Sequence, residues 1–198
     1  MKYINQPKTE RGEKTLHNII KAAETVFRDK GYNGATVKDI AREAGVSVGT
    51  FYIYFVDKKS IYDYLVQEYS YYIRSEISKR TSHLTDRKEI EREGLLVYLE
   101  IVRDKRHIYN IIWESLYIDP ANFKNYYMNF AKHYIAGLEN AVEKGDVRDD
   151  VNVEAVAWML MGVSNFLGLR YAIFKEDEDL EEIADLVIDV IDKGLFTQ

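Results

Sequence analysis

Apolar residues recur at spacings of three and four along most of the chain, the pattern of amphipathic α-helices, and no segment alternates like a convincing strand. The first stripe predicts a helix over about 14–30, with Gly31 as its C-terminal stop. Its apolar positions are Leu16, Ile19, Ile20, Ala23, Val26 and Phe27. The pattern predicts an all-α fold of about nine helices.

Two short helices joined by a tight turn are predicted over residues 36–55. Thr36 is a preferred N-cap residue, and Asp39 three positions later can complete a reciprocal cap. The first of the two helices ends at Gly45, which can adopt the positive φ that a turn between crossed helices needs. The second begins near Ser47. This arrangement is a helix-turn-helix unit.

Longer helices are predicted in the remainder of the chain. Asp57 is a suitable cap for a helix that runs to about Lys79, and the polar stretch Thr81–Arg87 reads as a loop. Further helices are predicted over about 89–104, 107–117, 120–144, 152–174 and 179–194, with Pro120, Asn152 and Asp179 at helix starts and Gly145 at a stop.

Charge is divided unevenly along the chain, whose net charge is −6. Residues 1–60 contain 11 Lys and Arg against 7 Asp and Glu, whereas residues 61–198 contain 16 against 26. A small DNA-binding head on an acidic body shows this asymmetry, although a surplus of this size also arises by chance. We therefore predict two domains, a helix-turn-helix domain over 1–60 and a helical domain over 61–198.

The composition narrows the class of protein further. The absence of cysteine excludes disulfides and thiolate metal sites, and it fits a cytoplasmic protein. No apolar stretch is expected to approach the roughly 18 residues that cross a bilayer. Residues 1–13 are polar and lack the apolar core of a signal peptide. We expect a cytoplasmic protein with no membrane association, no metal and no cofactor.

The run from Thr36 to Lys58, TVKDIAREAGVSVGTFYIYFVDK, resembles the signature of the TetR/AcrR family of transcriptional regulators. The string at 50–55 followed by Lys58 is the most specific part of this resemblance. The similarity is close over about 14–60 and continues beyond only as a helical body of the right length. It implies a regulator, usually a repressor, that binds a pseudo-palindromic DNA operator as a homodimer and responds to a small effector.

The predicted DNA contacts lie at the start and outer face of the second short helix and around the first. They are Thr36, Lys38, Ser47, Val48, Gly49, Thr50, Tyr52, Ile53, Tyr54 and Lys58. Short side chains let the backbone approach base edges, and hydroxyl groups can donate to phosphates. The resemblance implies phosphate contacts for Thr36, Thr50, Tyr52, Tyr54 and Lys58, a base or backbone contact for Lys38, and variable sequence-tuning positions at Ser47, Val48, Gly49 and Ile53.

Direct base reading by this set is expected to be limited. Ile53 can pack on a thymine methyl group, but the set contains no Arg, Asn or Gln, which are the strongest readers of bases. Shape and deformability of the DNA then contribute to specificity. Phe51 and Phe55 are interpreted as core residues, and packing under a neighbouring helix stays open as an alternative for Tyr52.

The resemblance places the dimer interface on the last two long helices, which pair as a four-helix bundle. Two apolar stripes are candidates, one on each helix: Val153, Val156, Ala157, Leu160, Ser164 and Leu167, and then Leu180, Ile183, Ala184, Val187, Val190 and Ile191. Gly162 and Gly168 permit close helix approach. These stripes could equally face the core of their own subunit, and periodicity alone does not separate the two interpretations.

The resemblance also implies an effector pocket in the C-terminal domain. Such pockets are mostly apolar with a few placed polar groups. The candidate lining residues are Trp113, Tyr117, Tyr127, Phe130 and Phe166, with Asn165 or Arg170 to orient the ligand. The alternative is that these aromatic residues form the core. Their character favours a small hydrophobic effector, such as a compound with a long acyl chain.

Two other classes of function fit the sequence less well. An enzyme is not expected, because His17, His83, His107 and His133 lack the spacing of a helical metal pair and no serine elbow or phosphate-cradling glycine loop occurs. An interaction scaffold that has lost DNA binding is the second alternative. The presence of Thr50, Tyr52, Tyr54 and Lys58 is an argument against it.

Overall fold

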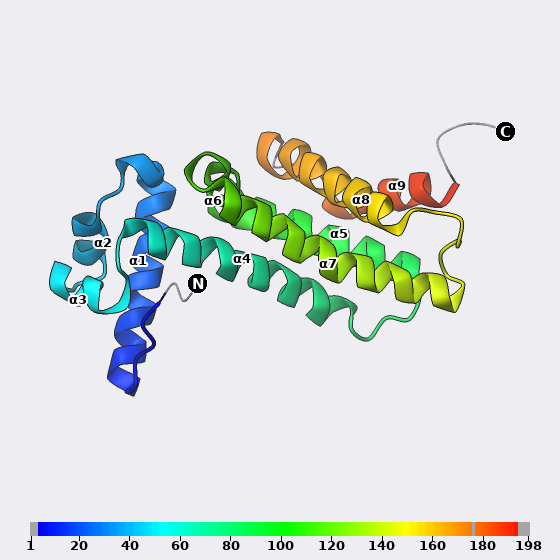
Figure 1. Cartoon of the computed structure of the whole chain (residues 1–198). Coiled ribbons are helices and arrows are strands. Elements are labelled where there is room, and N and C mark those ends of the chain that lie inside the picture. Colours follow the sequence, from blue (N-terminus) through cyan, green and yellow to red (C-terminus); the bar gives the residue numbers. More distant parts are fainter. Residues whose placement is uncertain (1–3, 176, 194–198) are drawn as a thin grey trace. The chain divides into compact units, whose positions relative to one another are not determined.

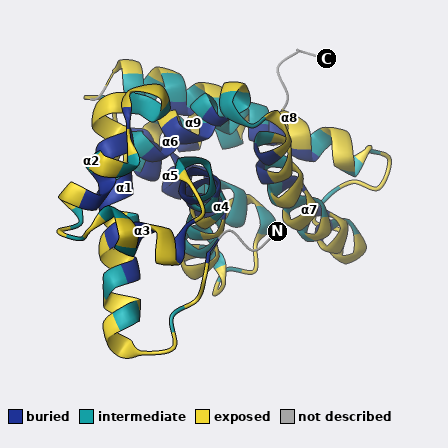
Figure 2. Ribbon diagram, turned by 60° about the vertical axis from the view of Figure 1, so that its left-hand side comes forward, coloured by how far each residue is buried: buried dark blue, intermediate teal, exposed yellow. Residues whose placement is uncertain are grey.

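The computed structural model describes residues 4–175 and 177–193. Within those residues the chain forms α-helices and one π-helical stretch, and no β-strand occurs there (Figure 1). The predicted all-α fold class is confirmed. Buried and exposed positions alternate along the helices (Figure 2), as expected where each helix presents one apolar face to its neighbours.

The chain divides into two compact units. The first consists of Met1–Tyr69 and His107–Tyr126, and the second of Ser70–Arg106 and Tyr127–Gln198. Each unit therefore combines segments that are distant in sequence. A functional division at residue 60 stays a prediction.

The first unit is built on α1, with α2 and α3 beside it (Figure 1). Its helices are α1 (Glu10–Gly34), α2 (Val37–Glu43), α3 (Val48–Tyr54), the first half of α4 (Lys58–Thr81), α6 (Arg106–Ile118) and the start of α7 (Pro120–Lys144). Ile19, Phe27 and Tyr62 are among its fully buried side chains, and the rings of Phe27 and Tyr62 meet edge to face at 5.0 Å.

Local signals set most helix ends in this unit. The capping box of Thr36 and Asp39 is present, Gly45 has a φ of 67°, and the Asp57 carboxylate accepts the backbone N–H of Ser60 at 2.7 Å, all as predicted. The start of α1 was predicted about four residues late, because Thr9 caps it and Glu10 is its first residue. Gly31, with a φ of 65°, interrupts this helix, which resumes for one turn to Gly34.

The second unit is organised around α5 (Arg87–Asp104), which packs against the three elements that follow α7. They are α8 (Val153–Leu167), the π-helical stretch η1 (Gly168–Phe174) and α9 (Leu180–Lys193). Asn152 and Asp179 cap α8 and α9 as predicted. The single helix predicted over 152–174 changes to π geometry at Gly168, where a Cβ atom would lie 3.3 Å from the Tyr98 ring.

Candidate nucleic-acid interface

The turn between α2 and α3 fixes one face of α3 against the core. The backbone N–H of Val46 donates to the carbonyl of Ala41 at 2.9 Å, and the positive φ of Gly45 makes this reversal possible. Ile40 and Phe51 are completely buried on the two sides of the turn. The opposite face of α3 is consequently held outward by a rigid support.

That outer face carries most of the predicted DNA contacts. Tyr52 and Ile53 are 51% and 63% exposed, and Ser47 and Gly49 are also exposed. The Ser47 hydroxyl accepts the backbone N–H of Thr50 at 3.0 Å and lies 2.9 Å from its hydroxyl, so Ser47 is the N-cap of α3. The arrangement suits a helix whose first turns enter a groove.

Tyr54 is placed differently from the prediction. It is only 8% exposed, and its hydroxyl donates to the backbone carbonyl of Gly12 in α1 at 3.2 Å. One helical turn from Phe51, it falls on the inner face of α3, so the expectation that it lies on the outer face was wrong. Its visible role is to hold α3 to α1.

Lys58 has a structural role that the sequence did not indicate. Its ammonium group donates to the carbonyls of Tyr32 and Ala35 at 2.6 and 2.8 Å, and it lies 4.2 Å from the centre of the Tyr32 ring. These carbonyls belong to the junction between α1 and α2. Two of the three ammonium donors are therefore engaged in the free protein, and one is left for a phosphate.

The same junction is held from α6. The backbone N–H of Tyr32 donates to the Glu114 carboxylate at 2.9 Å. The Tyr62 hydroxyl donates to the Ile111 carbonyl at 2.8 Å and lies 3.2 Å from the Glu114 carboxylate. A Cβ atom at Gly31 would lie 3.2 Å from the Glu114 carboxylate. Sequence reasoning missed Glu114, because nothing local connects it to a residue 82 positions away.

The start of α2 presents a mixed charge. The Thr36 hydroxyl donates to the Asp39 carboxylate at 2.7 Å, while Lys38 is exposed. An ion pair with Lys30 at 2.8 Å, and then the bond from Thr36, hold the pKa of Asp39 well below its ordinary value. Asp39 thus stays ionised and keeps accepting the Thr36 hydroxyl in the capping box. The Thr36 hydroxyl would have to rotate away from Asp39 before it could donate to a phosphate.

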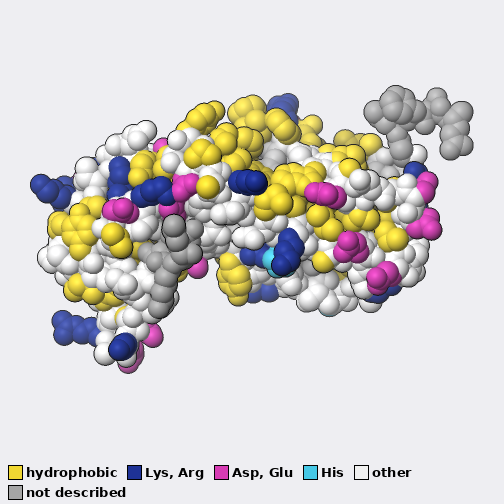
Figure 3. All heavy atoms as spheres, viewed as in Figure 1, with side chains coloured by type: hydrophobic (Ala, Val, Ile, Leu, Met, Phe, Trp, Pro, Cys, Tyr) yellow, Lys and Arg dark blue, Asp and Glu magenta, His cyan; other side chains and the backbone are white. Residues whose placement is uncertain are grey.

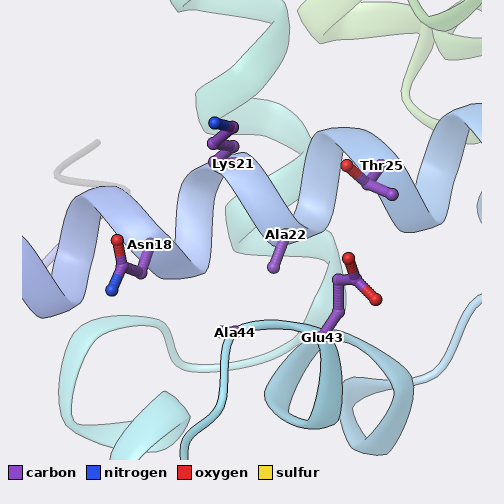
Figure 4. A pocket seen from close by; sticks show the side chains of 6 residues that line it. All are labelled: Asn18, Lys21, Ala22, Thr25, Glu43 and Ala44. Atoms are coloured by element: carbon purple, nitrogen blue, oxygen red, sulfur yellow. The ribbon is translucent and has the colours of Figure 1, made fainter.

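A surface hollow of about 290 Å³ lies between α1 and the end of α2 (Figure 4). Its lining is polar, with Asn18, Lys21 and Thr25 from α1 and Glu43 from α2. None of the predicted effector residues lines it. The hollow does not fit a hydrophobic effector, because it lacks aromatic walls.

The predicted effector residues are divided between the two units. Trp113 and Tyr117 belong to the first unit, whereas the other five belong to the second. Tyr117 is 87% exposed and Phe166 is 68% exposed, so within this chain neither has the burial expected of a residue that lines a pocket. Arg170, which was expected to orient the ligand, is exposed as well. These side chains occupy the outer faces of their helices.

Asn165 and Tyr127 are brought together. The side-chain oxygen of Asn165 accepts the hydroxyls of Tyr98 at 3.0 Å and Tyr127 at 3.1 Å, and the Tyr127 ring stacks with that of Trp158 at 6.4 Å. Tyr98 and Trp158 were not among the predicted lining residues. The cluster combines aromatic surface with one amide, the composition expected of a ligand-orienting site.

The outer faces of α8 and α9 expose large apolar side chains, and Figure 3 shows such side chains gathered over α8. They are Trp158, Met159, Phe166, Leu186, Val190 and Ile191, with Phe174 at the end of η1. The stripes predicted from the sequence are in part the inner ones, because Ala157, Leu160, Leu180 and Ala184 are buried within this chain. On α8 the outer stripe passes instead through Met159, Gly162, Val163 and Phe166.

The expectation about membrane spans also needs correction. Val153–Phe174 is long and apolar enough to cross a membrane by length and composition, and little of it is buried within the chain. This single segment is weak evidence for a span, since a helix of an oligomer interface has the same composition. No group of three His, Cys, Asp or Glu side chains suited to a metal ion occurs in the part of the chain that the structure describes.

The fold and the exposed face of α3 define a helix-turn-helix DNA-binding protein. Residues 19–65 match the family model of the bacterial regulatory proteins of the tetR family, which covers α1 from Ile19, all of α2 and α3, and the start of α4. The likeness to this family of transcriptional regulators therefore covers the helix-turn-helix part of the chain, residues 19–65. The family resemblance drawn from residues 36–58 is thereby confirmed.

The proteins that the chain resembles in sequence are described as HTH-type regulators of transcription. The chain is 26% identical over 184 residues to the transcriptional regulator YerO of Bacillus subtilis, covering 88% of this chain and only 62% of YerO. It is 26% identical over 173 residues to the transcriptional repressor AcnR of Corynebacterium glutamicum, covering 85% of this chain and 88% of AcnR. Regulators of transcription are typically not enzymes.

Solved structures share the fold over nearly the whole chain. The fatty acid degradation regulator FadR from Bacillus halodurans has a TM-score of 0.82 at 21% identity, covering 98% of this chain and 100% of FadR. FadR from Bacillus subtilis in complex with stearoyl-CoA has a TM-score of 0.77 at 18% identity, covering 91% of this chain and 100% of that one. At these identities the likeness establishes the fold alone.

Proposed function

We propose that the protein is a repressor that binds a pseudo-palindromic operator as a homodimer and releases it when a small hydrophobic effector binds the second unit. The observation that carries the proposal is the outer face of α3, where exposed Tyr52 and Ile53 are backed by fully buried Phe51. Large apolar side chains at the surface of a short, rigidly supported helix suit base-edge contacts in the major groove. The proposal places the protein in the cytoplasm and assigns it no catalytic step.

The proposed DNA contacts are the accessible part of the predicted set. Ser47, Val48, Gly49, Tyr52 and Ile53 would meet base edges or phosphates, and Thr50 and Lys38 would meet phosphates or the groove wall. Lys58 would contribute through its remaining ammonium donor and Thr36 after its hydroxyl leaves Asp39, whereas Tyr54 is assigned to support.

The dimer is proposed to form through the outer faces of α8 and α9. A continuous apolar surface on a monomer commonly marks an interaction site. A second copy of the same surface covers it symmetrically and also supplies the second reading head that one operator requires. Pairing of this kind would account for the apolar composition of Val153–Phe174 without a membrane.

The effector site is proposed around Asn165, Tyr98 and Tyr127. The complex of the B. subtilis FadR neighbour with stearoyl-CoA supports an acyl thioester as the first compound to test. The two hydroxyls that meet at Asn165 would be available to exchange partners with a polar group of such a ligand.

The test begins with DNA. The protein is incubated with a duplex from the region upstream of its own gene and, in parallel, with random-sequence duplexes from which a binding site is selected. We expect a footprint with two half-sites whose centres are separated by about one helical turn or a multiple of it. Protection of a single, asymmetric half-site, or no selection of sequence, would contradict the proposal.

Release is tested on the selected duplex with stearoyl-CoA, free CoA and stearate. Stearoyl-CoA is expected to raise both the thermal midpoint of the protein and its dissociation constant for DNA. Asn165→Leu is expected to reduce the response to stearoyl-CoA, whereas Asn140→Ala, at an exposed position of α7, serves as the control. Failure of all three compounds would reject the acyl thioester and leave the DNA result standing.

A further inference from the structure

The recognition helix α3 is too short to be stable by itself. It has only seven residues, and isolated helices shorter than about 12 residues are marginal in water. Its last four carbonyls lie beyond the reach of the helix's own N–H groups and need partners from elsewhere. The backbone N–H of Phe55 donates to the carbonyl of Phe51 at 3.1 Å, which satisfies the first of them.

A segment before α1 satisfies the last two carbonyls. The backbone N–H of Asn5 donates to the carbonyl of Tyr54 at 2.9 Å, and the side-chain amide of Asn5 donates to the carbonyl of Ile53 at 3.0 Å. One residue thus caps the C-terminal end of α3 with two donors, from 48 positions away in sequence.

Residues 4–9, which we call the N-terminal arm, are anchored on both sides of Asn5. Ile4 is buried, and the Thr9 hydroxyl accepts the backbone N–H of Gly12 at 3.2 Å. Pro7 lies so close to Gly12 that a Cβ atom there would be 2.8 Å from the Cβ of Pro7. The arm therefore has a defined path over the first turn of α1.

The anchoring closes a ring of contacts around the end of α3. The Tyr54 hydroxyl donates to the carbonyl of Gly12, and Asn5 donates back to Tyr54 and Ile53. The last turn of α3 is thus fixed from α1 and from the arm together. The exposed side chains of Tyr52 and Ile53 belong to this turn.

We propose that Asn5 is a positioning residue for DNA recognition, which holds the last turn of α3 in the geometry that Tyr52 and Ile53 need. The inference rests on the proposed DNA contact of α3. Asn5 itself touches no DNA in this account. Loss of its amide leaves the Ile53 carbonyl without a donor, and the last turn of α3 frays. DNA binding must then supply the free energy that orders this turn, so the affinity falls.

The experiment compares the full-length protein with Asn5→Ala and Asn5→Asp. Both variants lose the side-chain N–H donor, and Asp keeps the size of the side chain. Asn140→Ala, on the exposed side of α7, is the matched control. Two properties are measured: amide hydrogen exchange of residues 48–55 without DNA, and affinity for a duplex selected from random sequences by the unmodified protein, alongside an unrelated duplex of equal length.

We expect faster exchange in residues 48–55 of both variants, with α1 and α8 unchanged. Affinity for the selected duplex should fall about fivefold to tenfold, the range of one modest hydrogen bond. For the uncharged variant Asn5→Ala, affinity for the unrelated duplex and the salt slope should stay the same, because no phosphate contact and no charge is removed. Asn140→Ala should match the unmodified protein in every measurement.

Three outcomes would overturn the proposal. Unchanged exchange in residues 48–55 means that Asn5 does not order the helix, whatever the DNA result. Faster exchange throughout α1–α3 means that Asn5 supports the whole fold and has no specific role at α3. An equal loss of affinity for both duplexes in Asn5→Ala means that Asn5 contacts DNA directly. Because exchange is measured without DNA, a failure of the DNA-binding proposal remains distinguishable.

Discussion

The outer face of α3 and the outer faces of α8 and α9 both expose large apolar side chains, but the residues beside those side chains differ. Tyr52 and Ile53 stand beside small or hydroxyl-bearing residues on a seven-residue helix. Phe166, Met159 and Val190 belong to longer helices, each of which carries several exposed apolar side chains along its length. The difference points to two kinds of partner, a polar duplex for α3 and a second apolar surface for α8 and α9.

The largest effect is expected from breaking the apolar surface of α8. Introducing two carboxylates, Met159→Asp with Phe166→Asp, would place unpaired charges in the proposed dimer interface. We expect monomers in size-exclusion chromatography with light scattering, and a loss of operator affinity of at least about 100-fold.

Tyr71→Asp provides a matched surface control, because Tyr71 is an exposed aromatic residue on α4. It should leave the dimer intact. If the double variant stayed dimeric with unchanged operator affinity, α8 would not form the interface, and the contrast between the two surfaces would disappear.

The next effect concerns the phosphate contacts beside α3. Lys58→Ala should weaken binding to every duplex by about tenfold and reduce the salt slope by about one. It should also lower the thermal midpoint, since the carbonyls of Tyr32 and Ala35 lose their donor. Fluorescence anisotropy over a range of salt concentrations measures the slope, and calorimetry measures the midpoint.

Lys21→Ala, at an exposed position of α1, is the control for removal of one positive charge. A lower midpoint with an unchanged salt slope in Lys58→Ala would assign Lys58 to the α1–α2 junction alone. The phosphate role implied by the family resemblance would then be withdrawn for this residue.

Smaller effects are expected at the base-reading positions. Ile53→Ala and Val48→Ala should shift which base is preferred by about three- to tenfold at one or two positions of each half-site, because a lost apolar contact to a thymine methyl is worth roughly 1 kcal/mol. Affinity for unrelated duplexes should hold constant. Repeating the selection from random sequences with each variant measures the shift, and identical selected sequences would contradict these assignments.

The smallest expected effect is a pH dependence of the stability of the fold, caused by Asp39 at the start of α2. The pKa of Asp39 is held low by Lys30 and Thr36, so ionised Asp39 stabilises the fold above the ordinary pKa of about 4. This contribution is lost as pH falls below that value. The thermal midpoint of Asp39→Asn should therefore lie below that of the unmodified protein near neutral pH, with a gap that narrows below about pH 4. A gap that stayed constant with pH would assign the effect to the shape of the side chain.

The sequence predicted the first unit better than the second, for a physical reason. The caps at Thr36, Ser47 and Asp57 and the positive φ of Gly45 are set by residues within a few positions of one another, so they can be read locally. The buried place of Tyr54 depends on Gly12, 42 positions away, and it was missed.

In the second unit the positions of the helices could be predicted from the sequence, but the face that each helix buries could not. Both sides of α8 are apolar, so periodicity could not tell that Leu160 faces inward and Met159 outward. That distinction comes from packing against α5, which no local pattern encodes. The meeting of Tyr98, Tyr127 and Asn165 from three helices was equally out of reach.

The interruption of α1 at Gly31 has one more consequence. The residue that follows it is hydrogen-bonded to two other helices. The N–H of Tyr32 donates to Glu114 of α6, and the carbonyl of Tyr32 accepts from Lys58 of α4. A shift of α4 or α6 relative to this segment would break one of the two hydrogen bonds. The position of the segment that leads into α2 is therefore coupled to both helices. A side chain at position 31 would disturb this coupling, because its Cβ atom would contact the Glu114 carboxylate and an L-residue would have to adopt a positive φ.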